Sequence, residues 1–224
     1  MRTKQDILSR HYDFWEKLTE EEKNHILESC VNINYGKGET VHRSEERCKG
    51  AMTVLKGQLR VYIVSEEGRE VTLFRVREGE ICVLSASCLM DAIVFDVIIE
   101  AVEETESLVI PVQCLHPLME GNPYVGMELY RTAAERFSDV MWTMQQILFM
   151  GADRRVAAFL WDEYVRGGEE ISMTHDEVAR YIGSAREVVT KVLRYLSEEG
   201  AVALGRGKIR ITDREKLRKT AVTG

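Results

Sequence analysis

Two helix starts lie ten residues apart with a glycine between them, and this spacing constrains the fold more than any other feature of the 224-residue chain. Thr174 and Glu177 have the spacing of a capping box, in which each side chain accepts a hydrogen bond from the other residue's backbone amide. Ser184 and Glu187 repeat the arrangement. Gly183 can adopt the positive φ that a tight turn between helices requires. The segment therefore predicts two short helices joined by a sharp turn.

The second helix of this pair is amphipathic. Its apolar residues recur at spacings of three and four, which places them on one face against a core. They are Val189, Val192, Leu193 and Leu196. The opposite face is polar, and because arginine and lysine donate to guanine while glutamate accepts from cytosine, it suits a G·C-containing site. An isolated surface helix would instead use Glu187 and Lys191 as an ion pair. The predicted base contacts of this helix-turn-helix are Arg186, Glu187, Thr190 and Lys191.

A basic hairpin follows the second helix. Short apolar runs between Ala201 and Ile211 surround a Gly-Arg-Gly-Lys tip, the pattern of a β-hairpin wing. From Gly151 onward, 14 Lys and Arg outnumber 12 Asp and Glu, although the whole chain has a net charge of −7. That overall charge argues against indiscriminate nucleic-acid binding and favours a local basic surface that binds double-stranded DNA. The predicted phosphate contacts are Thr174, Ser184, Arg206 and Lys208.

The N-terminal half has a different pattern. Residues from about Ser9 to Cys30 are predicted to be helical, with Thr19 and Glu22 as another capping box. Between Val31 and Pro111, short apolar alternations are interrupted by glycine-containing turns, which predicts an antiparallel barrel or jelly roll. The fold class is therefore α+β.

A long helix is predicted after Asn122 and Pro123. Its apolar residues advance by three and four in alternation, as in a coiled-coil seam, over a helix of roughly 28 residues. A parallel homodimer would present two recognition helices to palindromic half-sites about 34 Å apart. The alternative is a single helix packed on its own barrel. Domain boundaries are predicted at 1–121, 122–150 and 151–224. The predicted dimer seam is Tyr130, Ala133, Phe137, Val140, Met144 and Ile147.

With barrel, long helix and winged helix-turn-helix in that order, the chain resembles the CRP/FNR family over nearly its whole length. The resemblance implies a DNA-binding transcription regulator with a cyclic-nucleotide-binding-like sensor domain, and RNA polymerase as a further partner. Family recognition helices commonly read Arg-Glu-x-x-x-Arg, and Lys191 departs from this pattern. Because lysine lacks the bidentate fork of arginine, its base is expected to be less strictly specified. The segments that carry the resemblance are Gly68–Leu73, Glu78–Glu80, Asp153–Ala157 and Gly183–Leu193.

The resemblance also separates this chain from two effector classes. Family members that bind cyclic AMP carry a Gly-Glu-Leu segment and an Arg-Ser pair, whereas this chain has Val83-Leu84-Ser85 and Phe95-Asp96. An aspartate there would repel a cyclic phosphate, so cyclic AMP is not the expected effector. Iron-sulfur members need cysteines near the N-terminus, and the first cysteine here is Cys30. An iron-sulfur cluster is therefore not expected.

The effector region offers other sensor candidates. A thiol switch, a soft metal or a small apolar ligand would suit Cys82 and Cys88, although buried cysteine also serves as a small hydrophobe. His42 and His116 are candidate haem or metal ligands, with ordinary packing as the alternative. The predicted sensor residues are Cys82, Ser85, Ser87 and Cys88.

Several function classes lack their motifs. The chain contains no His-x-His, Gly-x-Ser-x-Gly, phosphate loop or paired-cysteine zinc motif, so we do not expect an enzyme. No apolar run approaches the roughly 18 residues of a membrane span, and the N-terminus lacks a signal-peptide pattern. We therefore expect a cytoplasmic protein with reduced thiols and no membrane partner. A regulatory module without DNA binding is the alternative function, but Arg186, Lys191 and the tip at Arg206 and Lys208 favour DNA.

Overall fold

A computed structural model describes residues 3–43, 49–83 and 97–223 of the chain. It consists of two compact units. The first comprises Met1–Ile63 and Leu73–Val140, and the second comprises Val64–Thr72 and Met141–Gly224. Within the described ranges, no helix has both the length and the apolar character needed to cross a membrane.

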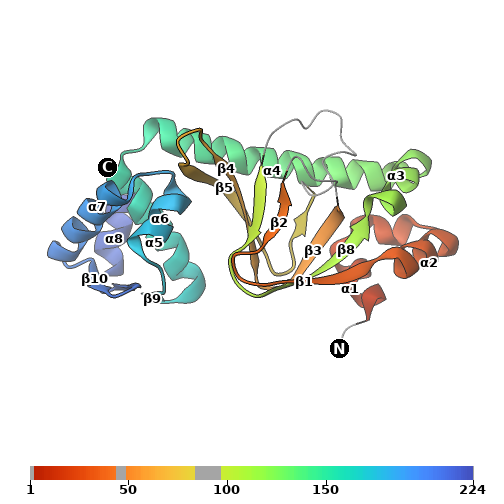
Figure 1. Cartoon of the computed structure of the whole chain (residues 1–224), viewed down its shortest axis with the longest axis horizontal. Helices are drawn as coiled ribbons and strands as arrows, with labels where there is room; N and C mark the ends of the chain where they lie inside the picture. Colours follow the sequence, from red (N-terminus) through yellow and green to blue (C-terminus); the bar gives the residue numbers. More distant parts are fainter. Residues whose placement is uncertain (1–2, 44–48, 84–96, 224) are drawn as a thin grey trace. The chain divides into compact units, whose positions relative to one another are not determined.

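The first unit is an antiparallel β-roll, and its described residues form two four-stranded sheets (Figure 1). One has the order β1-β8-β3-β6 and the other β2-β7-β4-β5. Tyr35 faces Thr105 across β1 and β8, and Val61 faces Ile99 across β4 and β7. The predicted antiparallel β region is therefore confirmed. The strands are β1 Val31–Tyr35, β2 Thr40–Arg43, β3 Gly50–Lys56, β4 Gln58–Val64, β5 Glu70–Arg77, β6 Ile81–Cys82, β7 Ile98–Ala101 and β8 Thr105–Pro111.

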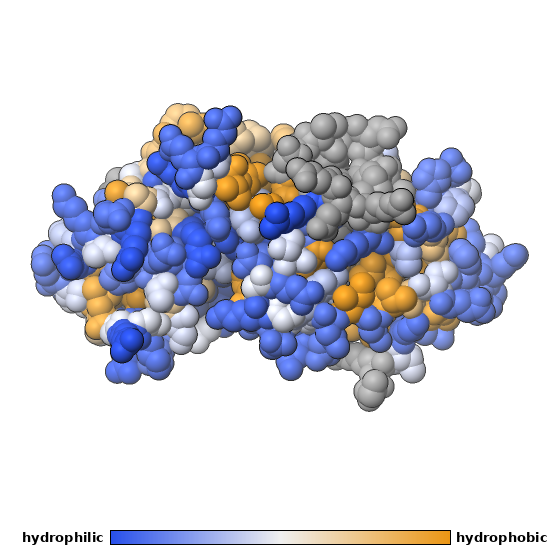
Figure 2. Space-filling model, in the orientation of Figure 1, coloured by the Kyte–Doolittle hydropathy of each residue, from blue (hydrophilic) through white to orange (hydrophobic). Residues whose placement is uncertain are grey.

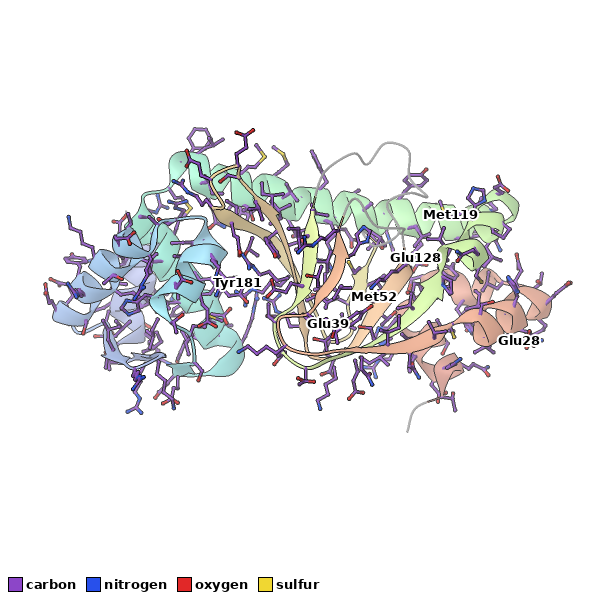
Figure 3. The ribbon with its side chains drawn as sticks, viewed as in Figure 1. Glu28, Glu39, Met52, Met119, Glu128 and Tyr181 are labelled. Carbon is purple, nitrogen blue, oxygen red and sulfur yellow. The ribbon has the colours of Figure 1, made fainter. Side chains whose placement is uncertain are left out.

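Most of the buried side chains of the roll are apolar, although Thr53 and Arg60 are buried as well. Alternate residues of a strand point to opposite faces of a sheet. In β5, for example, Phe74 and Val76 are buried while their neighbours are half-exposed. Met52, labelled in Figure 3, lies on β3 opposite Cys82 of β6. These side chains belong to one buried cluster, which also contains Val41, Val54, Leu59, Val61, Val97, Ile99, Ala101 and Val109.

The N-terminal region is helical, as predicted from about Ser9 to Cys30, and it consists of three pieces. They are α1 (Lys4–His11), a 3-10 helix η1 (Asp13–Lys17) and α2 (Glu20–Ser29). Between α1 and α2, Tyr12, Phe14 and Trp15 belong to a buried cluster, where Thr53 donates a 3.0 Å hydrogen bond to the Tyr12 hydroxyl. The capping box of Thr19 and Glu22 at the start of α2 is confirmed.

Two further helices follow the strands. They are α3 (Val112–Gly121) and α4 (Pro123–Phe149), and the 27 residues of α4 agree with the predicted long helix. The carboxylate of Glu128, labelled in Figure 3, accepts hydrogen bonds of 3.1 Å from the Asp13 amide and 2.6 Å from the Phe14 amide. Through this contact α4 holds the start of η1.

The second unit is a small helical domain with a three-stranded sheet. Its core joins one face of each helix to the sheet, and Tyr181, labelled in Figure 3, stacks on Phe159 with ring centroids 5.3 Å apart. The predicted wing is confirmed as β10 paired with β11, whereas the third strand, β9, was not predicted. The elements are α5 Ala152–Gly167, β9 Glu170–Ile171, α6 His175–Ile182, α7 Arg186–Glu198, β10 Val202–Gly205, β11 Lys208–Ile211 and α8 Arg214–Thr223.

Candidate nucleic-acid interface

The turn between α6 and α7 has the predicted geometry. Thr174 caps α6: its hydroxyl accepts from the Glu177 amide at 3.2 Å, and its own amide donates to the Glu177 carboxylate at 2.7 Å. Gly183 has φ = 64°, the left-handed conformation in which other residues are strained. The amide of Ser184 donates to the carbonyl of Ala179 at 3.0 Å, which closes the C-terminus of α6. This turn fixes the start of α7.

The second predicted capping box is wrong. The N-cap of α7 is Ala185, which makes no side-chain capping hydrogen bond, and Ser184 lies one position before it. The helix begins later than predicted because Gly183 and Ser184 close the end of α6. Glu187 is therefore not used in a cap. Glu187 also forms no ion pair with Lys191, so the structure does not contain the ion pair expected of an isolated surface helix.

The outward face of α7 forms a shallow hollow of about 580 Å³. Arg186, Glu187 and Lys191 are exposed on it, and Thr190 is half-buried. Hydrophilic side chains are prominent in this part of the surface in Figure 2. The hollow brings the four predicted base contacts together. Its lining also contains three residues that the sequence analysis missed although they continue the same helical spacing: Arg194, Tyr195 and Glu198.

A histidine of α6 reaches this face of α7. The Nδ1 atom of His175 lies 3.0 Å from the Thr190 hydroxyl in a partly buried contact. Burial lowers the pKa of His175, and the positive charges of Arg186 and Arg194 lower it further, so the ring is neutral at neutral pH. His175 was not among the predicted contacts, because contact between the first residue of one helix and the middle of the next depends on how the helices pack.

Two cationic side chains of the wing, Lys208 and Arg210, form ion pairs with one carboxylate. Glu170 of β9 accepts hydrogen bonds from Lys208 at 2.5 Å and from Arg210 at 3.3 Å. The hydrogen bond from Lys208, followed by that from Arg210, holds the pKa of the Glu170 carboxyl below its usual value. Arg206 lies at the exposed tip of the hairpin. The predicted phosphate contacts Arg206 and Lys208 thus lie on one hairpin, and an acidic neighbour holds Lys208.

The effector region is described only in part. Cys82 is 1% exposed in β6, and Cys82, Cys30 and Cys114 form no disulfide bond. His42 is buried, whereas the side chain of His116 is 62% exposed. In the described ranges no group of three or more His, Cys, Asp or Glu side chains is placed to hold a metal ion. The other predicted sensor residues lie outside the described residues: Ser85, Ser87 and Cys88.

The long helix α4 carries an exposed apolar surface. Four of the six predicted seam residues are exposed, whereas Ala133 and Val140 are half-buried against the cores of their own unit. Trp142 is 59% exposed and Phe149 is 78% exposed, which is unusual for side chains of this size. The exposed seam residues are Tyr130, Phe137, Met144 and Ile147.

A β-roll, a long helix with exposed apolar side chains and a winged helix-turn-helix together define a transcription regulator with an N-terminal β-roll domain. Two family models match the chain: the cyclic nucleotide-binding domain over residues 32–122 and the Crp-like helix-turn-helix domain over residues 154–220. The chain therefore belongs to the CRP/FNR family of transcriptional regulators. The predicted family, fold class and regulatory function are confirmed.

Individual relatives agree with this assignment. The chain is 31% identical to the transcriptional regulator SdrP of Thermus thermophilus, over 76% of this chain and 83% of that protein. It is 28% identical to the cyclic AMP receptor protein of the same organism, over 91% and 94% of the two chains. A solved structure of a CRP/FNR-family regulator from Eubacterium rectale superposes with a TM-score of 0.90 at 40% identity, covering 94% of this chain and 98% of that one.

Proposed function

We propose that the chain acts as a homodimer that binds a palindromic operator, with α7 of each subunit in the major groove. The observation that carries this proposal is the outward face of α7, where donors and acceptors suited to base edges line one hollow. Arg186 and Lys191 would donate to guanine, and Glu187 would accept from cytosine. In this proposal residues 1–121 form the sensor domain, residues 122–150 form the dimerisation helix and residues 151–224 form the DNA-binding domain.

The wing and the turn would contact phosphate. Arg206 and Lys208 lie on the hairpin, and the hydroxyl-bearing residues Thr174 and Ser184 lie near the starts of α6 and α7. Phosphate contacts position a protein on the duplex without reading its sequence. Residues on α7 and residues on the wing should therefore respond differently to DNA sequence and to salt.

Fluorescence anisotropy with operator and random duplexes at several salt concentrations tests this division. Arg186→Ala should cost about 1–3 kcal/mol per half-site on operator DNA and relax the preference at one base pair. Lys208→Ala should weaken both duplexes alike and lower the salt slope by about one unit. Arg214→Ala is the matched control, because it removes an exposed arginine of α8. If Arg186→Ala leaves the ratio of operator to random affinity unchanged, α7 does not read sequence.

Dimerisation through α4 follows from its exposed apolar side chains. Phe137 is 58% exposed, and burying it against a second copy would remove apolar surface from water. Phe137→Asp should therefore convert the dimer to a monomer in light scattering, whereas Val165→Asp, at a 65% exposed position of α5, should not. A monomeric wild type would refute this part of the proposal. RNA polymerase in the cytoplasm is the further partner that suits an operator-bound regulator.

We infer that the effector is not cyclic AMP. Much of the roll interior is a cluster of apolar side chains, and Phe74 is one of them. Arg136 of α4 lies 5.3 Å from the Phe74 ring and forms ion pairs of 3.3 Å with Glu80 and 3.1 Å with Asp139, so its charge is already balanced. Calorimetric titration should detect no specific uptake of cyclic AMP. Micromolar binding with a gain in operator affinity would overturn this inference.

A thiol response at Cys82 or Cys88 is the alternative control that the cysteines offer. The burial of Cys82 means that an oxidant reaches its thiol only when the roll opens locally. Operator affinity with and without peroxide, for wild type, Cys82→Ser and Cys88→Ser, tests this role. If all three proteins respond alike, both cysteines are packing residues.

A further inference from the structure

Thr190 differs in its hydrogen bonding from two other helical threonines, Thr132 and Thr220. Thr132 donates to the carbonyl of Glu128 at 3.0 Å, and Thr220 donates to that of Lys216 at 3.2 Å, four residues back in each case. Helical threonines divide between two χ1 rotamers because this carbonyl competes for the hydroxyl. Thr190 instead has its hydroxyl 3.0 Å from His175 Nδ1. The contact with the His175 ring therefore holds the Thr190 hydroxyl toward α6.

The position of this hydroxyl decides which group Thr190 offers to DNA. A threonine carries one hydroxyl and one methyl group on Cβ. Since the hydroxyl contacts His175 on α6, the methyl group is the other group that Thr190 can offer in the hollow of α7. Thymine alone among the bases presents a methyl group in the major groove.

We propose that His175 is a specificity-determining positioning residue, which holds Thr190 so that its methyl group reads a thymine in each operator half-site. The proposal rests on the proposed function, because it requires α7 in the major groove. His175 itself acts through Thr190, and its neutral ring adds no competing charge between Arg186 and Arg194.

Uracil substitution in the operator isolates the methyl contact, because uracil differs from thymine only in lacking that group. The operator is first selected from random duplexes with the full wild-type chain, and each thymine of a half-site is then replaced by uracil in turn. Wild type should lose about fourfold affinity per half-site at one position, the size expected for one buried methyl group. The loss should disappear in Thr190→Ser, which keeps the hydroxyl and lacks the methyl group.

Variants of His175 separate positioning from general stability. His175→Ala should abolish the uracil effect at that position, and His175→Gln, whose amide can still hydrogen-bond Thr190, should retain it. Adding Thr190→Val to His175→Ala should restore it, because valine presents a methyl group in the place of the hydroxyl as well. Affinity for random duplexes and thermal unfolding monitored by circular dichroism should stay near wild-type values.

The outcomes distinguish this proposal from the one on which it rests. If wild type selects an operator and His175→Ala keeps the full uracil effect, His175 does not position Thr190. If wild type selects an operator and no thymine responds to uracil, Thr190 does not read a methyl group, although the operator-binding function stands. If wild type selects no sequence, both proposals fail.

Discussion

Replacing Glu170 by glutamine should strengthen binding to DNA of any sequence. In the free protein the Glu170 carboxylate accepts hydrogen bonds from Lys208 and Arg210, so these two cations of the wing already have an anionic partner. A phosphate group must compete with that carboxylate for them. Glutamine has nearly the same shape without the charge, and it therefore leaves both cations available to DNA.

The size of the effect follows from counterion release. The logarithm of the binding constant falls with the logarithm of salt concentration at about 0.9 per phosphate neutralised. If the variant gains one phosphate contact, the slope should steepen by about 0.9, and affinity at 0.1 M salt should rise about eightfold relative to a 1 M reference. The wing alone would produce this change, so operator and random duplexes should gain equally.

Glu169→Gln is the matched control for this experiment. It removes the same charge one residue away, and the Glu169 side chain makes no ion pair with the wing cations. Anisotropy titrations from 0.05 to 0.3 M salt should show less than a twofold change for Glu169→Gln. Equal gains in the two variants would mean that net charge alone is responsible. No gain for Glu170→Gln would mean that the wing does not contact phosphate.

Three further predictions concern stability and are measured by urea denaturation. Gly183→Ala should lose about 1–2 kcal/mol because alanine is strained at φ = 64°, whereas Gly167→Ala, with open space around its Cβ, should be nearly neutral. Leu193→Ala should lose about 2–5 kcal/mol from a fully buried site, whereas Val188→Ala, at a 41% exposed position of the same helix, should lose under about 0.5 kcal/mol. Burial raises the pKa of the Glu128 carboxyl above 4.5, so the folded chain binds a proton at this carboxyl more tightly than the unfolded chain does. The contribution of Glu128 to the free energy of unfolding therefore falls as pH rises from 4.5 through the raised pKa. Glu128→Gln should flatten this part of the plot of stability against pH, and an unchanged plot would contradict this reasoning.

The elements that sequence predicted well are those with local causes. The capping box of Thr174 and Glu177, the left-handed Gly183 and the alternation of the wing strands each depend on a few neighbouring residues. Sequence patterns gave a wrong prediction where the end of one helix and the start of the next involved the same residue. Ser184 was predicted as an N-cap, but its backbone instead completes the C-terminal turn of α6, and the start of α7 moves to Arg186.

Contacts between distant segments could not be predicted from one sequence. The pairing of Glu170 with Lys208 depends on β9, a two-residue strand with too little sequence pattern to recognise. The contact of His175 with Thr190 depends on helix packing, since both residue types are common on exposed helix faces. In the N-terminal region the capping box of Thr19 and Glu22 marks the start of α2, but the sequence did not predict the 3-10 helix before it, in which Phe14 is buried.

The hydrogen bonds between Glu128 and the start of η1 can form only after the ribosome has synthesised α4. One of these bonds joins Phe14 and Glu128, which are 114 positions apart. At the usual 5–20 residues per second, the ribosome adds that length in roughly 6–23 s. Throughout that interval the nascent N-terminal segment lacks the carboxylate that receives its amides. Chaperones that hold exposed aromatic segments would therefore have their opportunity before α4 emerges, and a pause in translation upstream of Glu128 would lengthen it.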